Sequence, residues 1–518
     1  MIHGEPGSIA PMDEHNRVLL EHVHPSHWVN PESSARYNIV VLGAGTAGLI
    51  TAVVAAGIGA KVALIEQHLM GGDCLNVGCV PSKAVIRAAR AWSDLRNAAE
   101  FGLRIPPGVT YDFAAVMERM RRLRARISRH DSAGRYAGLG VDVYIGHGQF
   151  TAPGTIRVEG PAGGRTLTFA RAAICTGARP TVPPIPGLKE AGCLTNETVF
   201  SLTELPRRLA VIGAGPIGCE LAQSFARFGS RVHVFETQHG VLQREDRDAA
   251  EILQGRMERD GVSVFCCAKD LHVSTSEDGT HVTLTSHGER HHVTVDRILL
   301  GTGRTANVED LGLEAIGVEI DDAGVKVNAR LQTTNHTIYA AGDVCARYKF
   351  THAADAMAQV VVQNALFPHP FGLAYASVDS LTIPWCTYTQ PEVAHIGLYE
   401  HDAKALGIEV ETYTYRLDEV DRAVLDGEEE GFARIHVRKG SDRILGATIV
   451  AAHAGDMISE FSVLMKAGAG AKTIAAAIHP YPTQAEANKK VANLWRKARF
   501  TEGQKSILKK WFVWTRRG

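Results

Sequence analysis

Two cysteines five residues apart, Cys74 and Cys79, lie in the stretch GGDCLNVGCVPSK (71–83). Such a pair can supply half of a zinc site, a structural disulfide or a redox-active dithiol. Zinc usually takes two such pairs, and the sequence has no CxxC partner elsewhere. A structural bridge across so short a gap constrains little of the chain. The spacing therefore favours a redox pair.

Helix geometry supports this interpretation. In a regular helix, residues five apart have Cα atoms roughly 8 to 9 Å apart, which is too far for a disulfide. A bridge therefore requires a distorted helix start, which Gly78 permits. A strained, accessible disulfide is easily reduced, and a helix N-terminus stabilises a thiolate. We expect the bond between Cys74 and Cys79 to form and break during a reaction.

The composition is that of a soluble enzyme. The 518 residues suggest several domains, and the apolar (45%) and charged (21%) fractions are ordinary for a globular protein. A formal net charge of −1 gives no general attraction to nucleic acid or membranes. Nine cysteines are too few for a secreted disulfide framework. These totals predict a cytoplasmic enzyme without a nucleic-acid partner.

The segment 35–66 has the order strand, glycine turn, helix, strand that is typical of dinucleotide binding. Gly43, Gly45 and Gly48 have the GxGxxG spacing, which gives a tight turn, close approach to a pyrophosphate and close helix packing. The helix N-terminus would attract the phosphates. Glu66 ends the second strand, 23 residues after Gly43, where an acid can accept a ribose hydroxyl.

The same unit recurs at 207–236. Its members are Gly213, Gly215, Gly218 and, at the same 23-residue offset, Glu236. Two dinucleotide folds predict two dinucleotides, and a flavin paired with a nicotinamide makes hydride transfer the expected chemistry. Glu236 would bind the adenosine ribose and repel a 2′-phosphate, so NADH is expected in preference to NADPH. Arg244, in the next loop, is a positive charge that could instead favour the 2′-phosphate of NADPH.

These motifs together resemble the pyridine nucleotide–disulfide oxidoreductases. CLNVGC follows one GxGxxG unit, a second GxGxxG begins at residue 213, and AAGD follows at 340–343. The resemblance covers about residues 37 to 490, and GCVPSK, ARPTVPPIPGL and HPYPTQAE are most similar to mercuric reductases. It implies a homodimeric, NAD(P)H-dependent FAD enzyme.

The implied fold is α/β, with two Rossmann-like domains, for FAD and NAD(P), and a C-terminal α+β dimerisation domain. HTIYAAGDVC (336–345) predicts that the chain returns to the first domain after an insertion. The expected parts are a flexible N-terminal tail (1–36), an FAD domain in two pieces (37–185 and 305–379), an NAD(P) domain (186–304), a dimerisation domain (380–490) and a basic extension (491–518).

The resemblance also implies roles for single residues. Cys79 would lie against the flavin and receive its electrons, while Cys74 would be the exposed thiol that meets the acceptor. Lys83 would sit by flavin N5 and pair with Glu220, and Asp343 would bind the ribityl chain. Further cofactor contacts are expected at Gly72, Gly148, Thr176, Gly177, Gly303 and Thr351.

The stretch YPTQAE (481–486) bears on the electron acceptor. Disulfide reductases of the family have HPTxxE there, and the His carries the proton of the exchange thiol. Tyr481 takes the His position and Glu486 remains. A phenol with an ordinary pKa near ~10 is a poor base at neutral pH, but it could position a thiolate-bound metal ion. The alternative is a packing tyrosine, with His479 carrying the proton.

We therefore expect a soft metal ion such as Hg(II), or another small molecule, as the acceptor. The alternatives are a lipoamide- or glutathione-type disulfide reductase and, outside the enzymes, a redox-sensing flavoprotein without turnover. Two features depart from the pattern. The chain ends KKWFVWTRRG, without the vicinal cysteines that deliver the ion in mercuric reductases. Asp73 stands where threonine is usual, and its charge would repel a phosphate unless it points away.

The basic C-terminal segment 489–518 contains interleaved aromatic residues (Trp511, Phe512 and Trp514). Such a segment could contact an anionic membrane surface or pack on the dimer. The Arg-rich stretch 119–129 is expected to be a solvated helix face. Cys266 and Cys267 are expected within a buried strand, and no resident metal ion is expected.

Overall fold

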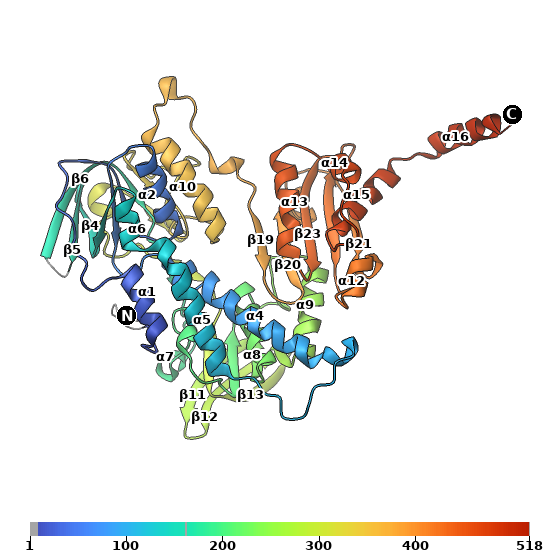
Figure 1. Ribbon diagram of the computed structural model, residues 1–518, viewed down its shortest axis with the longest axis horizontal. Helices are drawn as coiled ribbons and strands as arrows, with labels where there is room; N and C mark the ends of the chain where they lie inside the picture. The colour runs from blue at the N-terminus through green and yellow to red at the C-terminus, as the bar shows by residue number, and fades with distance from the viewer. Residues whose placement is uncertain (1–8, 161–162, 517–518) are drawn as a thin grey trace. The chain divides into compact units, whose positions relative to one another are not determined.

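The structure, a computed structural model, describes residues 9–160 and 163–516 (Figure 1). The chain forms two compact units. The first comprises Met1–His239 and Gly261–Leu381, and the second comprises Gly240–Asp260 and Thr382–Gly518. The mixed α/β architecture contains two Rossmann-like folds, both in the first unit, and an antiparallel sheet with helices in the second.

A seven-stranded sheet forms the centre of the first Rossmann-like fold. Its parallel strands are β3 (Val141–Ile145), β2 (Val62–Glu66), β1 (Tyr37–Leu42), β6 (Gly163–Ile174) and β18 (Ile338–Ala340), in that order. The long β6 also pairs antiparallel with β5 (Thr155–Gly160), which pairs with β4 (His147–Ala152). The pairing of β18 with β6 confirms that the chain returns to this domain after an insertion.

Helices cover this sheet and carry the cysteine segment. α2 (Thr46–Gly57) packs against α10 (Thr351–Leu366), as Figure 1 shows. The short α3 (Gly72–Asn76) leads into α4 (Cys79–Arg96), and α4 packs on α5 (Phe113–Ser128). α6 (Ala133–Gly138) packs against β3. Apolar side chains from α2, α10 and the sheet form one continuous core.

The second Rossmann-like fold has a four-stranded parallel sheet. Its order is β10 (Val262–Phe265), β9 (Arg231–Phe235), β8 (Arg208–Ile212) and β14 (Arg297–Leu300), with α8 (Pro216–Arg227) after the glycine turn. An antiparallel meander follows, formed by β11 (Lys269–Ser276), β12 (Gly279–Ser286) and β13 (Glu289–Val295). The two crossings between the domains, β7 (Ala178–Pro180) and β15 (Arg304–Ala306), pair with each other. Smaller elements are α7 (Leu188–Ala191), β16 (Ile320–Asp321) and β17 (Gly324–Val325).

The second unit is built on a five-stranded antiparallel sheet. Its order is β19 (Pro384–Thr387), β20 (Glu392–Gly397), β23 (Ile444–Ala451), β22 (Phe432–Arg438) and β21 (Val410–Arg416). The helices of this unit are α9 (Arg247–Arg259), α11 (Glu400–Ala405), α12 (Asp421–Leu425), α13 (Ala454–Lys466), α14 (Ala471–Ala476), α15 (Glu486–Ala498) and α16 (Glu502–Thr515). Side chains of α13, α14, α15 and the sheet share one apolar core.

Residues 240–260 belong to this second unit, although the sequence placed them in the NAD(P) domain. The buried Glu245 explains the difference: its carboxylate accepts hydrogen bonds from Trp385 Nε1, at 2.7 Å, and from the Tyr399 hydroxyl. Asp246 and Asp248 both pair with Arg434 on β22. These polar contacts join α9 to the antiparallel sheet.

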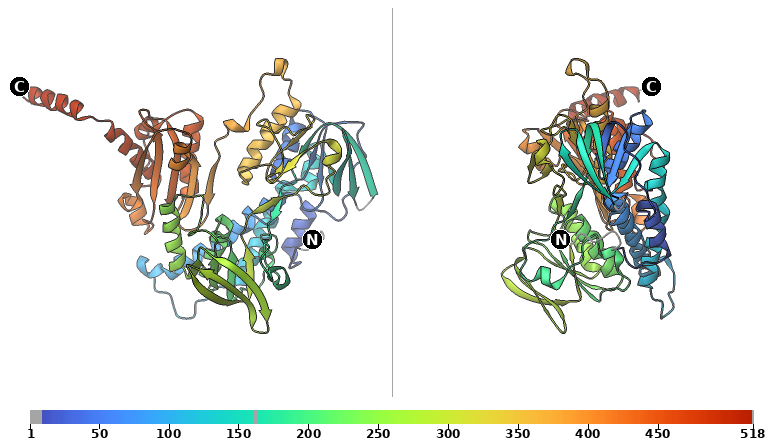
Figure 2. Two further views of the ribbon diagram at one scale, coloured as in Figure 1. Left: turned by 180° about the vertical axis from the view of Figure 1, so that it is seen from behind. Right: turned by 90° about the vertical axis from the view of Figure 1, so that its left-hand side faces the viewer.

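The prediction of a flexible N-terminal tail is wrong for residues 9–36, while residues 1–8 lie outside the described part. Residues 14–23 form α1 (Glu14–Val23), which lies alongside α5 (Figure 2). The side chain of Asp13 caps the helix by accepting a hydrogen bond from Asn16 N at 2.9 Å. Leu19 and Val23, one turn apart, are fully buried in the core of the first unit. The many histidines of the segment made it look polar, so the helical spacing of Leu19 and Val23 was overlooked.

The expected solvated face of 119–129 is also corrected. Arg121 Nε pairs with Asp13 Oδ2 at 2.5 Å, and the Arg121 side chain is only 7% exposed. The buried Arg124 donates to Asn76 O at 2.6 Å and to Asn16 Oδ1 at 2.7 Å. Burial lowers the pKa of Arg124 to about 10. These two arginines join α5 to α1 and to the end of α3.

The boundary of the basic extension lies further along the chain than residue 491. Val491, Ala492 and Trp495 of α15 are buried in the core of the second unit, so residues 491–498 are part of that domain. Every residue from 501 to 516 is exposed, and α16 extends beyond α15 (Figures 1 and 2). Within residues 9–160 and 163–516, no helix is long and apolar enough to cross a membrane.

Cys266 and Cys267 do not lie within a buried strand as expected. β10 ends at Phe265, and both cysteines follow it, half-buried. By contrast, Cys175 and Cys219 are buried, at 5% and 0% exposure.

Candidate functional site

The two glycine turns have the same local geometry. Gly43 and Gly213 have φ of +100° and +98°, and a Cβ on Gly43 would lie 2.4 Å from Cys175 O. A Cβ on Gly48 would lie 1.8 Å from Gly43 O, and one on Gly218 would lie 2.0 Å from Gly213 O. Only glycine fits these positions, because each turn and the helix that follows it come into backbone contact.

The predicted acids hold these turns in place. Glu66 Oε2 accepts a hydrogen bond from Ala44 N at 2.7 Å, and Glu236 Oε2 accepts one from Ala214 N at 2.9 Å. Burial raises the pKa of Glu66, and backbone N–H groups at His68 and Ala44 act in the opposite direction. Each carboxylate therefore lies at the glycine turn of its own fold.

The backbone at the first turn fits a pyrophosphate. Gly45 is the N-cap of α2 and has no capping side chain, so the first N–H groups of the helix are available to an anion. A Cβ on Gly72 would lie 2.6 Å from Gly45 Cα, so the two glycines bring bare backbone together. Gly215 occupies the equivalent uncapped position before α8. The chain thus offers a phosphate cradle in each fold.

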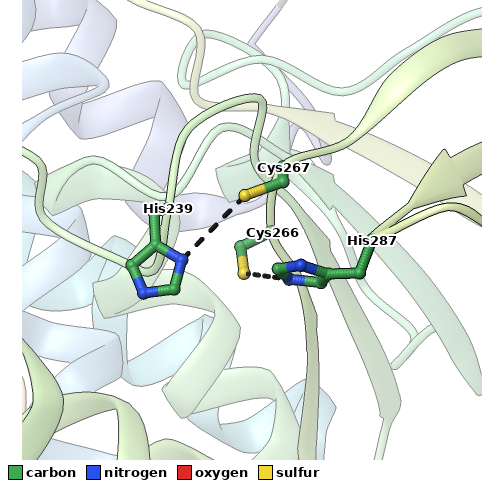
Figure 3. Close-up of side chains that lie close together, drawn as sticks. All are labelled: His239, Cys266, Cys267 and His287. Atoms are coloured by element: carbon green, nitrogen blue, oxygen red, sulfur yellow. Dashed lines mark hydrogen bonds between the residues drawn. The ribbon is translucent and has the colours of Figure 1, made fainter.

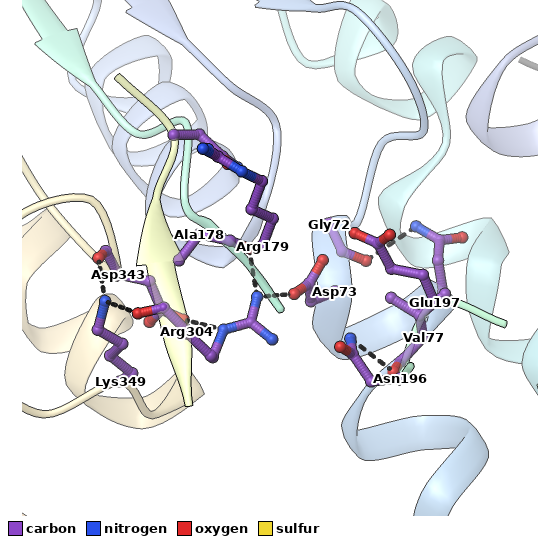
Figure 4. A network of polar contacts seen from close by, with 12 residues as sticks. Gly72, Asp73, Val77, Ala178, Arg179, Asn196, Glu197, Arg304, Asp343 and Lys349 are labelled. Atoms are coloured by element: carbon purple, nitrogen blue, oxygen red, sulfur yellow. Dashed lines mark hydrogen bonds and ion pairs between the residues drawn. The ribbon is translucent and has the colours of Figure 1, made fainter. Parts of the chain in front are cut away.

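Asp73 is neutralised by a residue that the sequence did not reveal. Arg304 forms an ion pair with Asp73 and donates to the carbonyl of Ala178 (Figure 4). It also lies 3.3 Å from Asp343 Oδ2, measured from Nε. Burial raises the pKa of Asp343, while Arg304 lowers it. Because Arg304 pairs with both carboxylates, the unusual Asp73 is accommodated beside Gly72.

Lys349 and Glu197 complete this charged region. Lys349 Nζ donates to the carbonyl oxygens of Arg304 and Asp343, both at 3.3 Å (Figure 4). Burial raises the pKa of Glu197, and the nearby Asp73 adds to the effect. Asp343 is thus held next to an arginine and a lysine at the end of β18.

Cys74 and Cys79 are brought together by the break between α3 and α4. α3 ends at Asn76, and α4 begins at Cys79 after Gly78, whose φ and ψ are −130° and −112°. A Cβ on Gly78 would lie 2.7 Å from Asp73 O, so the close approach needs glycine. The distorted helix start expected from the sequence is therefore present. Both cysteines are free thiols in the structure, and the expectation that Cys74 is the exposed one is wrong, because Cys79 is exposed and Cys74 is half-buried.

The two sulfurs have opposite acidities. Cys74 donates a hydrogen bond to Cys79, and this bond, with burial, raises the pKa of Cys74. The same bond lowers the pKa of Cys79 to about 6, helped by the Thr351 hydroxyl, 3.3 Å from Cys79 Sγ, and by the charge of Lys83. Cys79 is also the first residue of an 18-residue helix, where the dipole favours a thiolate.

Lys83 pairs with Glu220, as the resemblance implies. The Nζ–Oε2 distance is 2.9 Å, and the Glu220 side chain is only 5% exposed. The pair joins α4, which carries Cys79, to α8 of the second Rossmann-like fold, and these helices pack together. The charge that assists the Cys79 thiolate is therefore anchored by a buried carboxylate.

The remaining predicted cofactor residues lie at strand ends. Thr176 Oγ1 donates to Asn307 O at 2.7 Å, and Asn307 Nδ2 donates to Thr176 O at 2.9 Å. Gly177 and Gly303 have φ of +71° and +102° next to the paired crossings β7 and β15. Gly148 is a packing position, because a Cβ there would lie 2.6 Å from Leu42 Cδ1.

Three predicted residues lie in the second unit. The Tyr481 hydroxyl donates to Asp421 Oδ2 at 2.7 Å, and this bond raises the pKa of Tyr481. Glu486 Oε1 instead pairs with Lys490 at 3.2 Å. His479 Nε2 lies 2.9 Å from Glu460 Oε1. The partner of Tyr481 is thus Asp421, a residue that sequence reasoning missed because it lies 60 positions away.

Comparison with known protein families gives two matches. Residues 37–359 match the pyridine nucleotide–disulphide oxidoreductase model, and residues 383–492 match the dimerisation domain of the same group. The chain is 34% identical over 449 residues to a dihydrolipoyl dehydrogenase of Geobacillus stearothermophilus, which covers 86% of this chain and 93% of that protein. It is 33% identical over 457 residues to a mercuric reductase of Staphylococcus aureus, which covers 88% and 82%.

Solved structures show the same fold. The Cu(II) complex of the HOCl-induced flavoprotein disulfide reductase RclA from Escherichia coli superposes with a TM-score of 0.78 at 28% identity. The match covers 89% of this chain and all of that one. LpdA from Mycobacterium tuberculosis superposes with a TM-score of 0.79 at 25% identity, over 88% of this chain and 99% of that one.

The acidity of Cys79 can be measured by the pH dependence of its alkylation. Because the folded pKa is lowered, the reactive thiolate is present above about pH 6 and is lost as the pH falls through that value. We expect the rate of reaction of reduced protein with iodoacetamide, followed at Cys79 by mass spectrometry, to show a midpoint near pH 6. Thr351→Val should move the midpoint towards the ordinary ~8.5, and Thr351→Ser should not.

Cys193 in the same digest is the internal reference, because burial raises the pKa of its thiol. It should react as a thiolate only at higher pH. If Cys79 and Cys193 were alkylated with the same pH midpoint, the claim that the hydrogen bond from Cys74 lowers the pKa of Cys79 would be wrong.

Proposed function

Because the chain belongs to the pyridine nucleotide–disulphide oxidoreductase family, whose members use FAD and NAD(P)H, we propose that it transfers electrons from NADH to the Cys74–Cys79 pair and from there to a soft metal ion. The family's dimerisation domain spans residues 383–492, which supports a homodimer. Bound FAD would supply the ring that accepts hydride from the nicotinamide.

The observation that carries the proposal is the unequal sulfur pair. Cys79, with a pKa of about 6, would be a thiolate at neutral pH, and Cys74 would keep its proton. A charged sulfur on a helix N-terminus beside Lys83 is suited to face the flavin. Cys74 is suited to meet the acceptor once it gives up its proton, because the thiolate is the metal ligand. Two electrons and one proton reduce the disulfide to this thiol–thiolate state. Transfer of the two electrons to Hg(II) yields elemental mercury, restores the disulfide and releases the Cys74 proton to solvent.

The second unit favours a metal ion over a disulfide as acceptor. Reduction of an external disulfide needs a group that takes up and returns a proton. The hydrogen bond to Asp421 raises the pKa of Tyr481, so the phenol stays protonated and cannot serve as that base. A neutral phenol can still orient a thiolate-bound ion, because a metal ion takes up electrons without a proton and the Cys74 proton can leave to solvent.

The relatives support both an enzyme and a soft-metal acceptor. The mercuric reductase of Staphylococcus aureus covers most of this chain, and the similar RclA structure is a Cu(II) complex. Dihydrolipoyl dehydrogenases are equally similar, so reduction or oxidation of a lipoamide-type disulfide is the competing function. In that case the proton carrier would be His479, which pairs with Glu460.

An NADH-oxidation panel with Hg(II), Cu(II), lipoamide, glutathione disulfide and a quinone tests the acceptor. General acid–base catalysis contributes at least about 100-fold to such reactions. We therefore expect kcat/KM for Hg(II) or Cu(II) to exceed that for either disulfide by about that factor. Tyr481→His should raise the rate with lipoamide or glutathione disulfide, and the matched Tyr481→Phe should not. Fast disulfide turnover that Tyr481→Phe leaves unchanged would overturn the metal assignment and point to His479.

The nucleotide preference can be tested at Glu236. Its carboxylate would accept the adenosine ribose hydroxyls and repel a 2′-phosphate. We expect kcat/KM to be higher for NADH than for NADPH, and Glu236→Gln to lower that ratio about tenfold, since a hydrogen bond to a charged group contributes about 1.5–3 kcal/mol. Glu66→Gln, the same change in the first fold, should leave the ratio per bound flavin unchanged. A wild-type preference for NADPH would overturn the role proposed for Glu236.

The exposed α16 supports a contact with an anionic membrane surface. Its Trp511 and Trp514 are 54% and 64% exposed, and Lys505, Lys509 and Lys510 lie on the same helix. We expect the protein to sediment with anionic vesicles at low salt and less at high salt. A chain ending at Phe500, which keeps α15 and its core contacts, should not sediment. If the full chain and the chain ending at Phe500 sediment equally, α16 does not bind membranes, and a role in packing on the dimer is favoured instead.

A further inference from the structure

Four metal-ligating side chains converge in the second Rossmann-like fold, away from Cys74 and Cys79 in the sequence. They are His239, Cys266, Cys267 and His287, and their ligand atoms all lie within 4.8 Å of one another (Figure 3). Cys266 Sγ lies 3.2 Å from His287 Nε2, and Cys267 Sγ lies 3.9 Å from His239 Nδ1. Two sulfurs and two imidazoles therefore point towards one place.

Three segments supply these side chains. His239 follows β9, the two cysteines follow the adjacent parallel strand β10, and His287 occupies the turn between β12 and β13. The carboxyl ends of parallel neighbours lie at one edge of a sheet, so the first two segments meet there. The meander then brings His287 to the same edge. No single stretch of sequence contains a metal motif, which is why the set was missed.

Hydrogen bonds fix the three segments to one another. Cys267 N donates to Gln238 O at 2.9 Å, and this bond holds the cysteine loop against the His239 loop. Ser286 Oγ donates to Cys266 O at 2.6 Å, which ties the turn before His287 to the same loop. The ligand atoms are thus positioned by backbone contacts as well as by their own rotamers.

The distances match a tetrahedral site. With metal–sulfur bonds of about 2.3 Å and metal–nitrogen bonds of about 2.0–2.1 Å, a tetrahedral ion holds S and N ligands about 3.6 Å apart. The two measured S–N distances, 3.2 and 3.9 Å, fall on either side of this value. A two-sulfur, two-nitrogen donor set is typical of Zn²⁺. His239 and His287 are exposed and the cysteines are half-buried, so an ion can enter from solvent.

The backbone at two ligands adds an independent observation. Cys267 and His287 have φ of +55° and +48°, the left-handed region that side chains other than glycine rarely adopt. A left-handed residue costs roughly 1–2 kcal/mol. Only Cys267 needs a special explanation, because His287 and Gly288 form the two-residue hairpin loop between Ser286 and Glu289, and such a turn has positive φ at both positions. The left-handed Cys267 directs its side chain from the loop after β10.

We propose that His239, Cys266, Cys267 and His287 form a Zn²⁺ site on the NAD(P)-binding domain. The ion would hold the loop after β9, which begins with Glu236, against the loop after β10. Glu236 already shares this framework, because its N–H donates to Phe265 O and its carbonyl accepts from Ala268 N, both at 2.9 Å. The site does not rest on the proposed acceptor or on the role of Tyr481.

Full-length, FAD-loaded protein carrying Cys74→Ser and Cys79→Ser is the parent for the test, because these changes remove the other pair of neighbouring thiols, at the redox site. After treatment with a chelator and a reductant, the parent is titrated with Co²⁺, which gives visible bands and sulfur-to-metal absorption when bound tetrahedrally by thiolates. Zn²⁺ should displace the Co²⁺. After gel filtration, elemental analysis should find about one Zn²⁺ per chain.

Adding Cys266→Ser and Cys267→Ser to the parent should abolish the cobalt–thiolate absorption and the retained Zn²⁺. His287→Asn should weaken Zn²⁺ binding at least about tenfold. Because His287 lies at an exposed turn, this variant provides a test even if the double cysteine change prevents folding. Cys193→Ser and His272→Asn are matched controls that should bind like the parent. Failure of the parent to retain Zn²⁺, or equal retention after loss of Cys266 and Cys267, would overturn the site and assign any bound metal to surface histidines.

Because the parent cannot turn over through Cys74 and Cys79, this result is independent of the acceptor panel. If the protein binds Zn²⁺ as expected but reduces disulfides faster than metal ions, the Zn²⁺ site is supported and the proposed function is overturned.

Discussion

The close approach of Gly78 to the carbonyl of Asp73 is the constraint on which the redox site depends. It ends α3, allows α4 to begin at Cys79, and so brings together two sulfurs that a continuous helix would separate. Any side chain at Gly78 would meet backbone rather than a movable group, so the approach cannot be relieved locally. The sulfur contact is therefore fixed by the backbone before any cofactor contributes.

The charges around this segment depend on one another. Lys83 favours the Cys79 thiolate and is itself held by the buried Glu220. Arg304 forms ion pairs with Asp73, which directly precedes Cys74, and with Asp343. These pairs come from different domains of the sequence but from one unit of the structure. Loss of Arg304 would leave Asp73 and Asp343 near each other without the cation that pairs with both, whereas loss of Asp73 would leave Arg304 paired with Asp343. Substitution is therefore expected to be less well tolerated at Arg304 than at Asp73.

The sequence predicted the parts of the site that depend on short spacing. The two GxGxxG turns, their acids, the cysteine pair and the return of the chain at β18 all follow from local patterns, and the structure forms them. The site residues that could not be predicted from the sequence are those that depend on contacts between distant segments. Examples are Arg304, Asp421 and the cluster of His239, Cys266, Cys267 and His287, because each is recognised only by its contact with residues far along the chain.

The wrong predictions have a shared cause. Polar composition suggested a flexible tail before residue 36 and a solvated face at 119–129. Yet Leu19 and Val23 are buried, and Arg121 and Arg124 are used to satisfy Asp13, Asn16 and the carbonyl of Asn76. Likewise, the many basic residues after 489 concealed the buried stripe of α15. A few well-spaced apolar or paired side chains decide burial, and average polarity does not show them.

The hydrogen bonds from Ala44 to Glu66 and from Ala214 to Glu236 limit how the cofactor preference of this protein can change. In each fold, one side chain braces the glycine turn and, in the role proposed for it, would also accept the sugar hydroxyls. Replacing Glu236 with a small or basic residue would admit an extra phosphate, but it would also release the turn that grips the pyrophosphate common to both nucleotides. A switch of donor would therefore need a second substitution that restores the turn. Redesign, or natural drift, towards the phosphorylated nucleotide would have to pass through a form that binds either nucleotide poorly.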